Sequence, residues 1–232
     1  MSTRPPYLGA ALSLGVATGI GGFSFGVLAV AAGLSAAQAC VMSLLVFTGG
    51  SQFAFVGVIA SGGAATTATA SALLLGARNT AYGFSVAPLL PRTLAGRAAA
   101  SQLVIDESTA MARAQPDPAD ARGAFYATGI AIFVLWNLGT AGGALLGGEL
   151  DPQAYGLDAL FPAAFLALLA PQLRQPQAPA LALAGALIAV VLIPLTPAGI
   201  PVIGASLAMV LVLRRPSAAA EAQADAPPEG QA

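Results

Sequence analysis

Long apolar windows alternate with short clusters of Pro, Gly and charged residues along most of the chain. The longest run without Asp, Glu, Lys or Arg covers residues 5–77. As one helix this run would be about 110 Å long, whereas a bilayer core is about 30 Å thick and is crossed by about 20 apolar residues. The run therefore predicts three consecutive membrane-spanning segments.

Seven apolar windows are predicted to span a membrane. The fifth is short, and the last two are divided by Pro194, Pro197 and Pro201, a pattern typical of broken or re-entrant helices. We therefore expect an all-α integral membrane protein with about seven transmembrane helices, in a range of about six to eight. The windows are residues 8–32, 36–60, 64–90, 124–147, 157–171, 178–195 and 197–213.

Two short segments resemble each other and suggest an internal repeat. Gly33–Ala39 leads into the second predicted span, and Glu149–Ala154 leads into the fifth. A true repeat would relate spans one to three to spans four to six, and the odd number of spans would make the second unit inverted. Chance similarity between Ala-rich segments explains the likeness equally well.

The domain organisation follows from these windows. A transmembrane domain is expected over residues 8–213, with an N-terminal tail at 1–7 and a C-terminal tail at 214–232 that we expect to be disordered. Residues 91–123 form the one substantial polar loop. Counting Arg on alternate sides of seven spans leaves Arg4 alone on one side, which favours a cytoplasmic C-terminus in the plasma membrane.

Composition supports a lipid-bilayer protein and removes several classes of chemistry. Charged residues make up 8% of the chain, against about 25% in soluble globular proteins. The chain has no His, no Lys and one cysteine, Cys40. We therefore expect no metal site, no cofactor and no enzyme activity based on a Ser–His or Ser–Lys pair. The formal charge of −1 and the lack of a basic stripe argue against a nucleic-acid partner.

Arg78 falls near the middle of the third predicted span. A charge there costs about 2.5 kcal/mol or more, so its side chain must face a protein interior or a wet cavity. Ser71 and Tyr82 lie within about 40° of its direction on an ideal helix, which places a polar stripe on this segment. Arg78 then either pairs with a substrate carboxylate or a coupling acid, or forms a structural salt bridge.

The second predicted span carries Gly49, Gly50 and Gln52 at its middle. Adjacent glycines loosen a helix and free backbone carbonyls for a ligand, and Gln52 offers two donors and an acceptor. Close helix packing, with Gln52 bonded to a neighbouring helix, is the alternative. In the fourth span Asn137 follows Trp136 beside a ladder of glycines, and such ladders favour helix packing.

Asp106 and Glu107 lie in a less polar part of the loop, where residues 103–112 predict a helix at the membrane surface. Adjacent residues diverge by about 100° on a helix, so we expect only one of the two to face the bundle. That residue would be a proton or salt-bridge site. Solvation of both carboxylates is the alternative.

Six short motifs together resemble the AzlC family of branched-chain amino-acid exporters. They are Phe23–Ala29, Ala32–Ser35, Met42–Phe53, Ala77–Gly83 with Ala87–Pro88, Ile105–Ser108 and Trp136–Gly139, and the likeness covers roughly residues 8–212. It implies the large subunit of a two-component exporter, whose partner AzlD is a small hydrophobic protein. Members often have Asn two residues before the Arg and His just after it, where this chain has Gly76 and Asn79.

We therefore expect a permease that exports valine, leucine, isoleucine or similar apolar amino acids across the cytoplasmic membrane, with an AzlD-like partner. An ATP-driven transporter subunit and a permease for another small hydrophobic solute are the alternatives. Asp106 and Glu107 are the candidate coupling residues. The candidate substrate-binding residues are Gly49, Gly50, Gln52, Arg78, Asn79, Tyr82 and Asn137.

Overall fold

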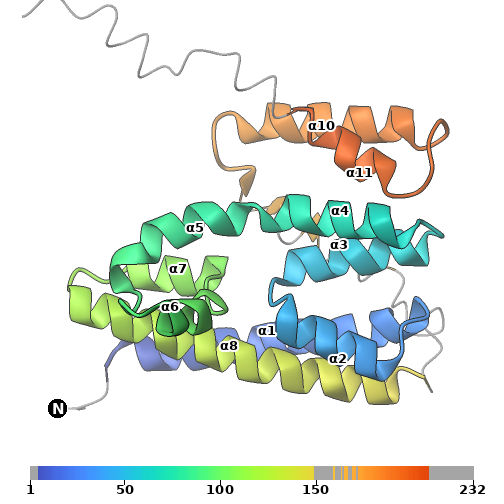
Figure 1. Ribbon diagram of the computed structural model, residues 1–232. Helices are drawn as coiled ribbons and strands as arrows, with labels where there is room; N and C mark the ends of the chain where they lie inside the picture. The colour runs from blue at the N-terminus through green and yellow to red at the C-terminus, as the bar shows by residue number, and fades with distance from the viewer. Residues whose placement is uncertain are drawn as a thin grey trace, which may run out of the picture. The chain divides into compact units, whose positions relative to one another are not determined.

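Two long apolar helices, α1 (Tyr7–Ala31) and α8 (Pro118–Leu146), lie side by side in the computed structural model (Figure 1). The structure describes residues 5–148, 159, 163, 165, 166, 169, 170 and 172–208. Within these residues every element is helical. By length and composition, α1 and α8 are the two helices there that are long and apolar enough to cross a membrane.

Small residues bring α1 and α8 into backbone contact. Gly15 lies against Ala131, and Gly26 lies against Ala144, so residue numbers rise together and the helices run parallel. A Cβ atom at Gly139 would overlap the carbonyl of Gly19. The expectation that the glycine ladders serve helix packing is thereby confirmed.

A helical hairpin replaces the second predicted span. Residues 36–60 form α2 (Ala36–Leu45) and α3 (Gly49–Ala60), with a break at Val46–Thr48. The α2 helix begins at a capping box near the C-terminal end of α8 and runs toward the middle of α8. The hydroxyls of Ser43, late in α2, and Thr140 of α8 lie 3.1 Å apart. The α3 helix then turns back, since Phe53 meets Phe25 in the C-terminal half of α1. One continuous span over 36–60 is therefore wrong.

The third predicted span is present as two nearly continuous helices. They are α4 (Ala65–Gly76) and α5 (Arg78–Val86), followed by the 3-10 turn η1 (Ala87–Leu89). Ala77 between them keeps helical dihedral angles, so the segment bends slightly without turning back. Its first half, α4, packs against α3. Its last residue, Val86, packs with Phe125 near the start of α8.

A second helix pair occupies the predicted polar loop. Residues 91–123 contain α6 (Leu94–Ser101), α7 (Asp106–Arg113) and the first turn of α8. The pair enters the helical core: Ile105 joins the cluster of Ile132, halfway along α8, while Ala112 joins that of Phe125. A helix is present within the expected residues 103–112, but it begins at Asp106 and its start lies in the core and not at a membrane surface. A loop over 91–123 is wrong.

The two helix pairs meet at their tips, residues 46–48 and 102–105. The Gln102 side chain donates from Nε2 to the carbonyls of Leu44, at 2.8 Å, and Leu45, at 3.4 Å. The tips also share sequence, with Ser43–Thr48 reading SLLVFT and Ser101–Asp106 reading SQLVID. Two similar hairpins thus reach the middle of the bundle from opposite ends.

The hairpins change the expected sidedness of the N-terminus. Because α2 and α3 fold back, only α1 and the α4–α5 segment connect the chain's start to residues 91–123. Tyr7 accordingly lies against Gly123, at the start of α8. The start of α1 is therefore on the same side as the Arg-rich segment, not opposite to it as the seven-span count placed Arg4.

The second unit, residues 169–232, is described in part. It contains α10 (Ala178–Leu192), within the sixth predicted span, and the short α11 (Ile200–Ala205), within the seventh. Gly204 of α11 packs on Leu192, and Gly185 of α10 faces Ala205. Most of the fifth predicted span, the Glu149–Ala154 likeness and the C-terminal tail lie outside the described residues, and seven spans are not confirmed.

Candidate functional site

A cavity of about 320 Å³ lies where both hairpin tips meet α1, α5 and α8. We call it the central cavity. Its wall is mostly apolar, from Phe47, Phe53, Ile105, Ile132 and Trp136. Its volume is at the small end of the range of roughly 300–1,000 Å³ typical of ligand pockets, so it suits a small molecule with an apolar part.

Trp136 forms a rigid side of this cavity. Its indole stacks on Phe25, with centroids 6.4 Å apart, and meets the edge of Phe53 at 6.2 Å. Gly21 and Gly49 leave the room that the indole occupies: a Cβ on Gly49 would lie 2.8 Å from Trp136 Cη2. The glycine at position 49 is therefore needed for close approach of an aromatic ring.

The first turn of α3 faces the central cavity with unpaired backbone amides. Gly49 and Gly50 line it, and the N-cap residue Thr48 gives the helix no side-chain cap. The first amides of a helix have no acceptor within the helix, and the N-terminal end carries about half a positive charge. The sequence predicted free carbonyls at these glycines. At a helix N-terminus the amides are the free groups, so the site here favours an anion.

Arg78 and Asp106 form an ion pair beside this helix end, with Nη1 and Oδ2 3.6 Å apart. Both side chains are about one-third exposed and both line the central cavity. The Nε atom of Arg78 is shielded from solvent and has no hydrogen-bond partner. One charge of each sign is thus present in the wall, with donor capacity left on Arg78.

Asp106 and Glu107 both line the central cavity. The expectation that only one would face the bundle is wrong, because α7 meets the cavity with its end rather than its side. Burial is the main cause that raises the pKa of Glu107 to about 7, and the neighbouring Asp106 raises it further. Glu107 can therefore take up or release a proton near neutral pH. It belongs to α7, which is one arm of a hairpin and does not cross the bundle.

The other predicted residues lie around the cavity without lining it. Gln52 is completely buried, and neither atom of its amide has a partner. Asn79 faces a neighbouring pocket, and Tyr82 packs beside Val86. Asn137 donates from Nδ2 to the Phe133 carbonyl of its own helix at 2.8 Å, so this side chain is occupied within α8.

Several residues of the site were not expected from the sequence. Phe47, Phe53, Ile105 and Ile132 form the apolar wall, and their side chains carry the same sequence signal whether they face lipid or a cavity. Gln102, which joins the tips, was also missed. In the sequence Gln102 directly precedes the apolar residues 103–105, and this position could have indicated a hairpin tip. It was missed because residues 91–123 were interpreted as a loop.

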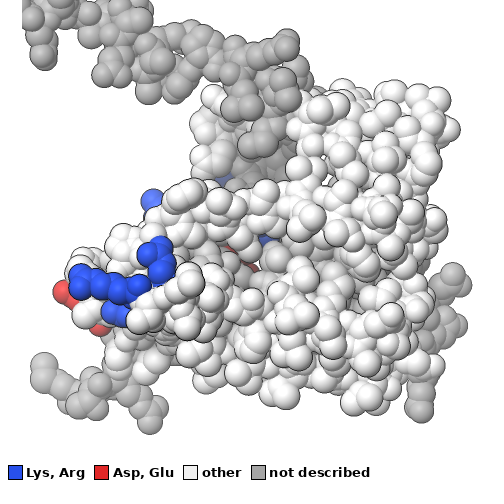
Figure 2. Space-filling view, viewed as in Figure 1, with Lys and Arg blue, Asp and Glu red and all other residues white. Residues whose placement is uncertain are grey.

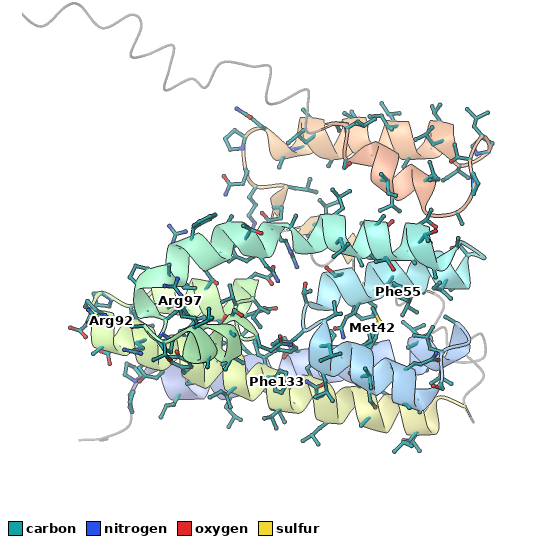
Figure 3. The ribbon with its side chains drawn as sticks, viewed as in Figure 1. Met42, Phe55, Arg92, Arg97 and Phe133 are labelled. Atoms are coloured by element: carbon teal, nitrogen blue, oxygen red, sulfur yellow. The ribbon has the colours of Figure 1, made fainter. Side chains whose placement is uncertain are left out.

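Arg side chains gather at the end of the unit where α5, α6 and α7 lie (Figure 2). Arg92 and Arg97 are found there (Figure 3), and Arg113 ends α7 at the same end, just before α8 begins. Exposed Arg concentrated at one end of a helical bundle is typical of the cytoplasmic side.

Comparison with known proteins places this architecture in a family. The family described as AzlC protein matches residues 13–150, more than half of the chain. The match extends from α1 to the end of α8 and includes both hairpins and the central cavity. No curated protein and no solved structure matches the chain.

Proposed function

Because the chain belongs to the AzlC family, whose members are membrane-transport proteins, we propose that it exports branched-chain or similar apolar amino acids across the cytoplasmic membrane. The observation that carries the proposal is the central cavity. Groups that favour an anion and groups that favour a cation face one small, otherwise apolar space there.

A zwitterionic amino acid fits these groups. Its carboxylate binds the free amides at Gly49 and Gly50, with Arg78 at its side, as anions bind at helix N-termini. Its ammonium group binds the carboxylates of Asp106 and Glu107. The alkyl side chain then lies against Ile132 and the aromatic residues, where the volume left by Trp136 limits its size.

The hairpins provide the moving parts for alternating access. Each hairpin places its tip in the wall of the cavity, and each tip interrupts the helical backbone. Movement of the first hairpin opens the cavity toward the loops at Gly33 and Gly62. Movement of the second opens it toward the Arg-rich end. Transporters use such discontinuous helices around a central site.

A small hydrophobic subunit fits a second, larger feature of the same unit. An apolar groove of about 980 Å³ lies between α2, α3 and α4. Met42 of α2 and Phe55 of α3 line it together (Figure 3). We propose this groove as the contact surface for an AzlD-like partner, since its lining has the apolar character of a helix–helix interface within a membrane.

Efflux from cells tests the function. Cells are loaded with valine- or isoleucine-containing dipeptides, with and without this chain and a small partner, and internal and external amino acid is measured. We expect faster efflux of the branched-chain amino acid, and no change for glutamate or lysine from matched dipeptides. ATP depletion at constant membrane potential separates this from an ATP-driven transporter. Equal efflux in both strains, with the chain in the membrane, overturns the proposal.

A further inference from the structure

A second polar pocket, of about 390 Å³, lies on the other side of the first hairpin tip. We call it the tip pocket. It is formed by residues 45–48 of that tip, by α5 and by the end of α6, and it shares Phe47 with the wall of the central cavity. Its oxygen-bearing side chains are those of Thr48, Asn79, Thr80, Ser101 and Gln102.

Two of these side chains carry buried oxygens without a partner. Thr48 Oγ1 and Asn79 Oδ1 are shielded from solvent and make no hydrogen bond. Thr48 stands at the N-cap of α3, with φ −153° and ψ 102°, where a Thr hydroxyl usually accepts a bond from its own helix. Here it makes no such bond. Buried oxygens that neither helix nor neighbour satisfies are available for a ligand.

The electrostatics of the tip pocket favour a cation. The last carbonyls of α2, those of Leu44 and Leu45, already accept from Gln102 Nε2, so the groups left without a partner are the oxygens of Thr48 and Asn79. The N-terminus of α3, with its positive end, faces the central cavity instead. Hairpin tip 46–48 therefore has free amides at the central cavity and unpartnered oxygens at the tip pocket.

The ligand set selects among cations. The residues that line the tip pocket are all uncharged, whereas Ca²⁺ and Mg²⁺ sites usually contain carboxylates. Arg78, Asp106 and Glu107 line the central cavity and not the tip pocket, and Arg78 is paired with Asp106. Unwound backbone and neutral oxygens at a half-helix end are typical of Na⁺ sites in transporters.

We propose that the tip pocket binds Na⁺ through Thr48 and Asn79, and that the bound ion orders the substrate site without itself being carried across the membrane. The ordering of the substrate site rests on the proposed function, whereas the binding does not. The ion acts through Thr48: holding the N-cap of α3 fixes the amides of Gly49 and Gly50 that receive the substrate carboxylate. Substrate and Na⁺ then favour each other's binding, as two ligands of one ordered element must.

The test measures Na⁺ binding to the purified full chain in detergent, without amino acid. Melting temperature is followed in NaCl, KCl and choline chloride at equal ionic strength, together with binding of radioactive Na⁺. We expect a saturable rise specific to Na⁺ in the wild type and in Thr48→Ser. We expect the apparent affinity to fall about tenfold or more in Thr48→Val and in Asn79→Ala, as for loss of a buried ligand. Thr66→Val, an exposed hydroxyl on α4 outside both pockets, is the matched control.

The outcomes separate this site from the proposed function. No Na⁺-specific effect in the wild type overturns the tip pocket as a Na⁺ site, even if valine stabilises the protein. The same conclusion follows if Asn79→Ala and Thr48→Val bind Na⁺ like the wild type. A Na⁺ effect that requires Thr48, with no response to valine at any Na⁺ concentration, keeps the site and removes the amino-acid assignment.

Discussion

Gln102 connects the two hairpins at their tips: its Nε2 atom donates to the Leu44 carbonyl at 2.8 Å, across 58 residues of sequence. The same group lies 3.4 Å from the carbonyl of Leu45. Both carbonyls belong to the last turn of α2, where a helix has no partners of its own. One side chain therefore satisfies the end of one hairpin and sets its distance from the other.

Replacing Gln102 should loosen the tips. For Gln102→Leu we expect a loss of unfolding free energy of about 1 kcal/mol, the net value of such a hydrogen bond, together with a lower transport rate. Thermal unfolding and efflux measure the two effects. Gln115→Leu is the control, because the Gln115 side chain donates to the Met111 carbonyl at the end of α7, four residues before it, and does not join the tips. Equal behaviour of the two variants would show that the tips do not depend on this bond.

The ion pair of Arg78 and Asp106 should matter more for transport than for stability. Both groups are about one-third exposed, and pairs of this kind contribute about 0–1 kcal/mol to stability. Arg78→Ala should reach the membrane in normal amount and lose export. Restored export in the double variant Arg78→Ala, Asp106→Asn would assign the pair a structural role only. Quantified membrane protein and efflux distinguish these cases.

Glu107 should make the stability of the protein depend on pH. Its pKa of about 7 in the folded chain lies above the ordinary value, so the folded state binds more protons than the unfolded state between these values. This contribution to stability is complete below pH 4.5 and is lost as the pH rises through 7. Melting temperature in detergent from pH 5 to 8 should fall less in Glu107→Gln. The exposed Asp120→Asn should follow the wild type.

Gly49 and Gly9 offer a matched pair of glycine substitutions. A Cβ on Gly49 would lie 2.8 Å from the Trp136 ring, whereas a Cβ on Gly9 has no atom within 4 Å. Gly49→Ala must therefore shift the indole or the start of α3, both in the wall of the central cavity, and we expect export to fall about tenfold or more, corresponding to about 1.4 kcal/mol or more. Gly9→Ala should remain near the wild type. A normal efflux rate for Gly49→Ala would remove Trp136 from the substrate wall.

The hairpins also predict a specific membrane topology. In a Cys40→Ser background, single cysteines placed at Arg97 and Arg113 should react with membrane-impermeant thiol reagents only from the cytoplasmic side. Cysteines at Ala31, before α2, and at Gly62, in the turn between α3 and α4, should both react only from outside. Reaction of these two positions from opposite sides would show that residues 36–60 cross the membrane after all.

Part of this architecture was accessible from the sequence. The windows at α1 and α8 were clear because both are long and uniformly apolar. Residues 36–60 were wrongly predicted to be one span, because a hairpin with two apolar arms has the length and hydropathy of one span. Only Thr48, followed by Gly49 and Gly50, marks the start of the second helix in the sequence. The apolar run after Gln102 was part of the same signal, since it repeats the tip at Ser43–Thr48.

The candidate site was found in its charged part and missed in its apolar part. Arg78, Asp106 and Glu107 stand out in an apolar chain because burying charge is costly. Ile132 and Phe53 do not, because nothing in an apolar sequence tells which helix face meets a cavity. The roles of Gly49 and Gly50 changed for a similar reason: freed amides and freed carbonyls differ only in which end of a helix is present.

Meeting hairpins have an electrical consequence. In the proposed alternating-access cycle the central cavity opens to one side at a time, so the membrane voltage would fall mainly across the tip that is closed, and not evenly along the full thickness. Moving one elementary charge across 100 mV corresponds to about 2.3 kcal/mol. A bound zwitterion has no net charge and is insensitive to this force. In the proposed cycle the voltage therefore acts on any ion or proton that accompanies it and on the charged residues that move with a hairpin, such as Asp106 and Glu107, and the dependence of export on membrane potential would report both.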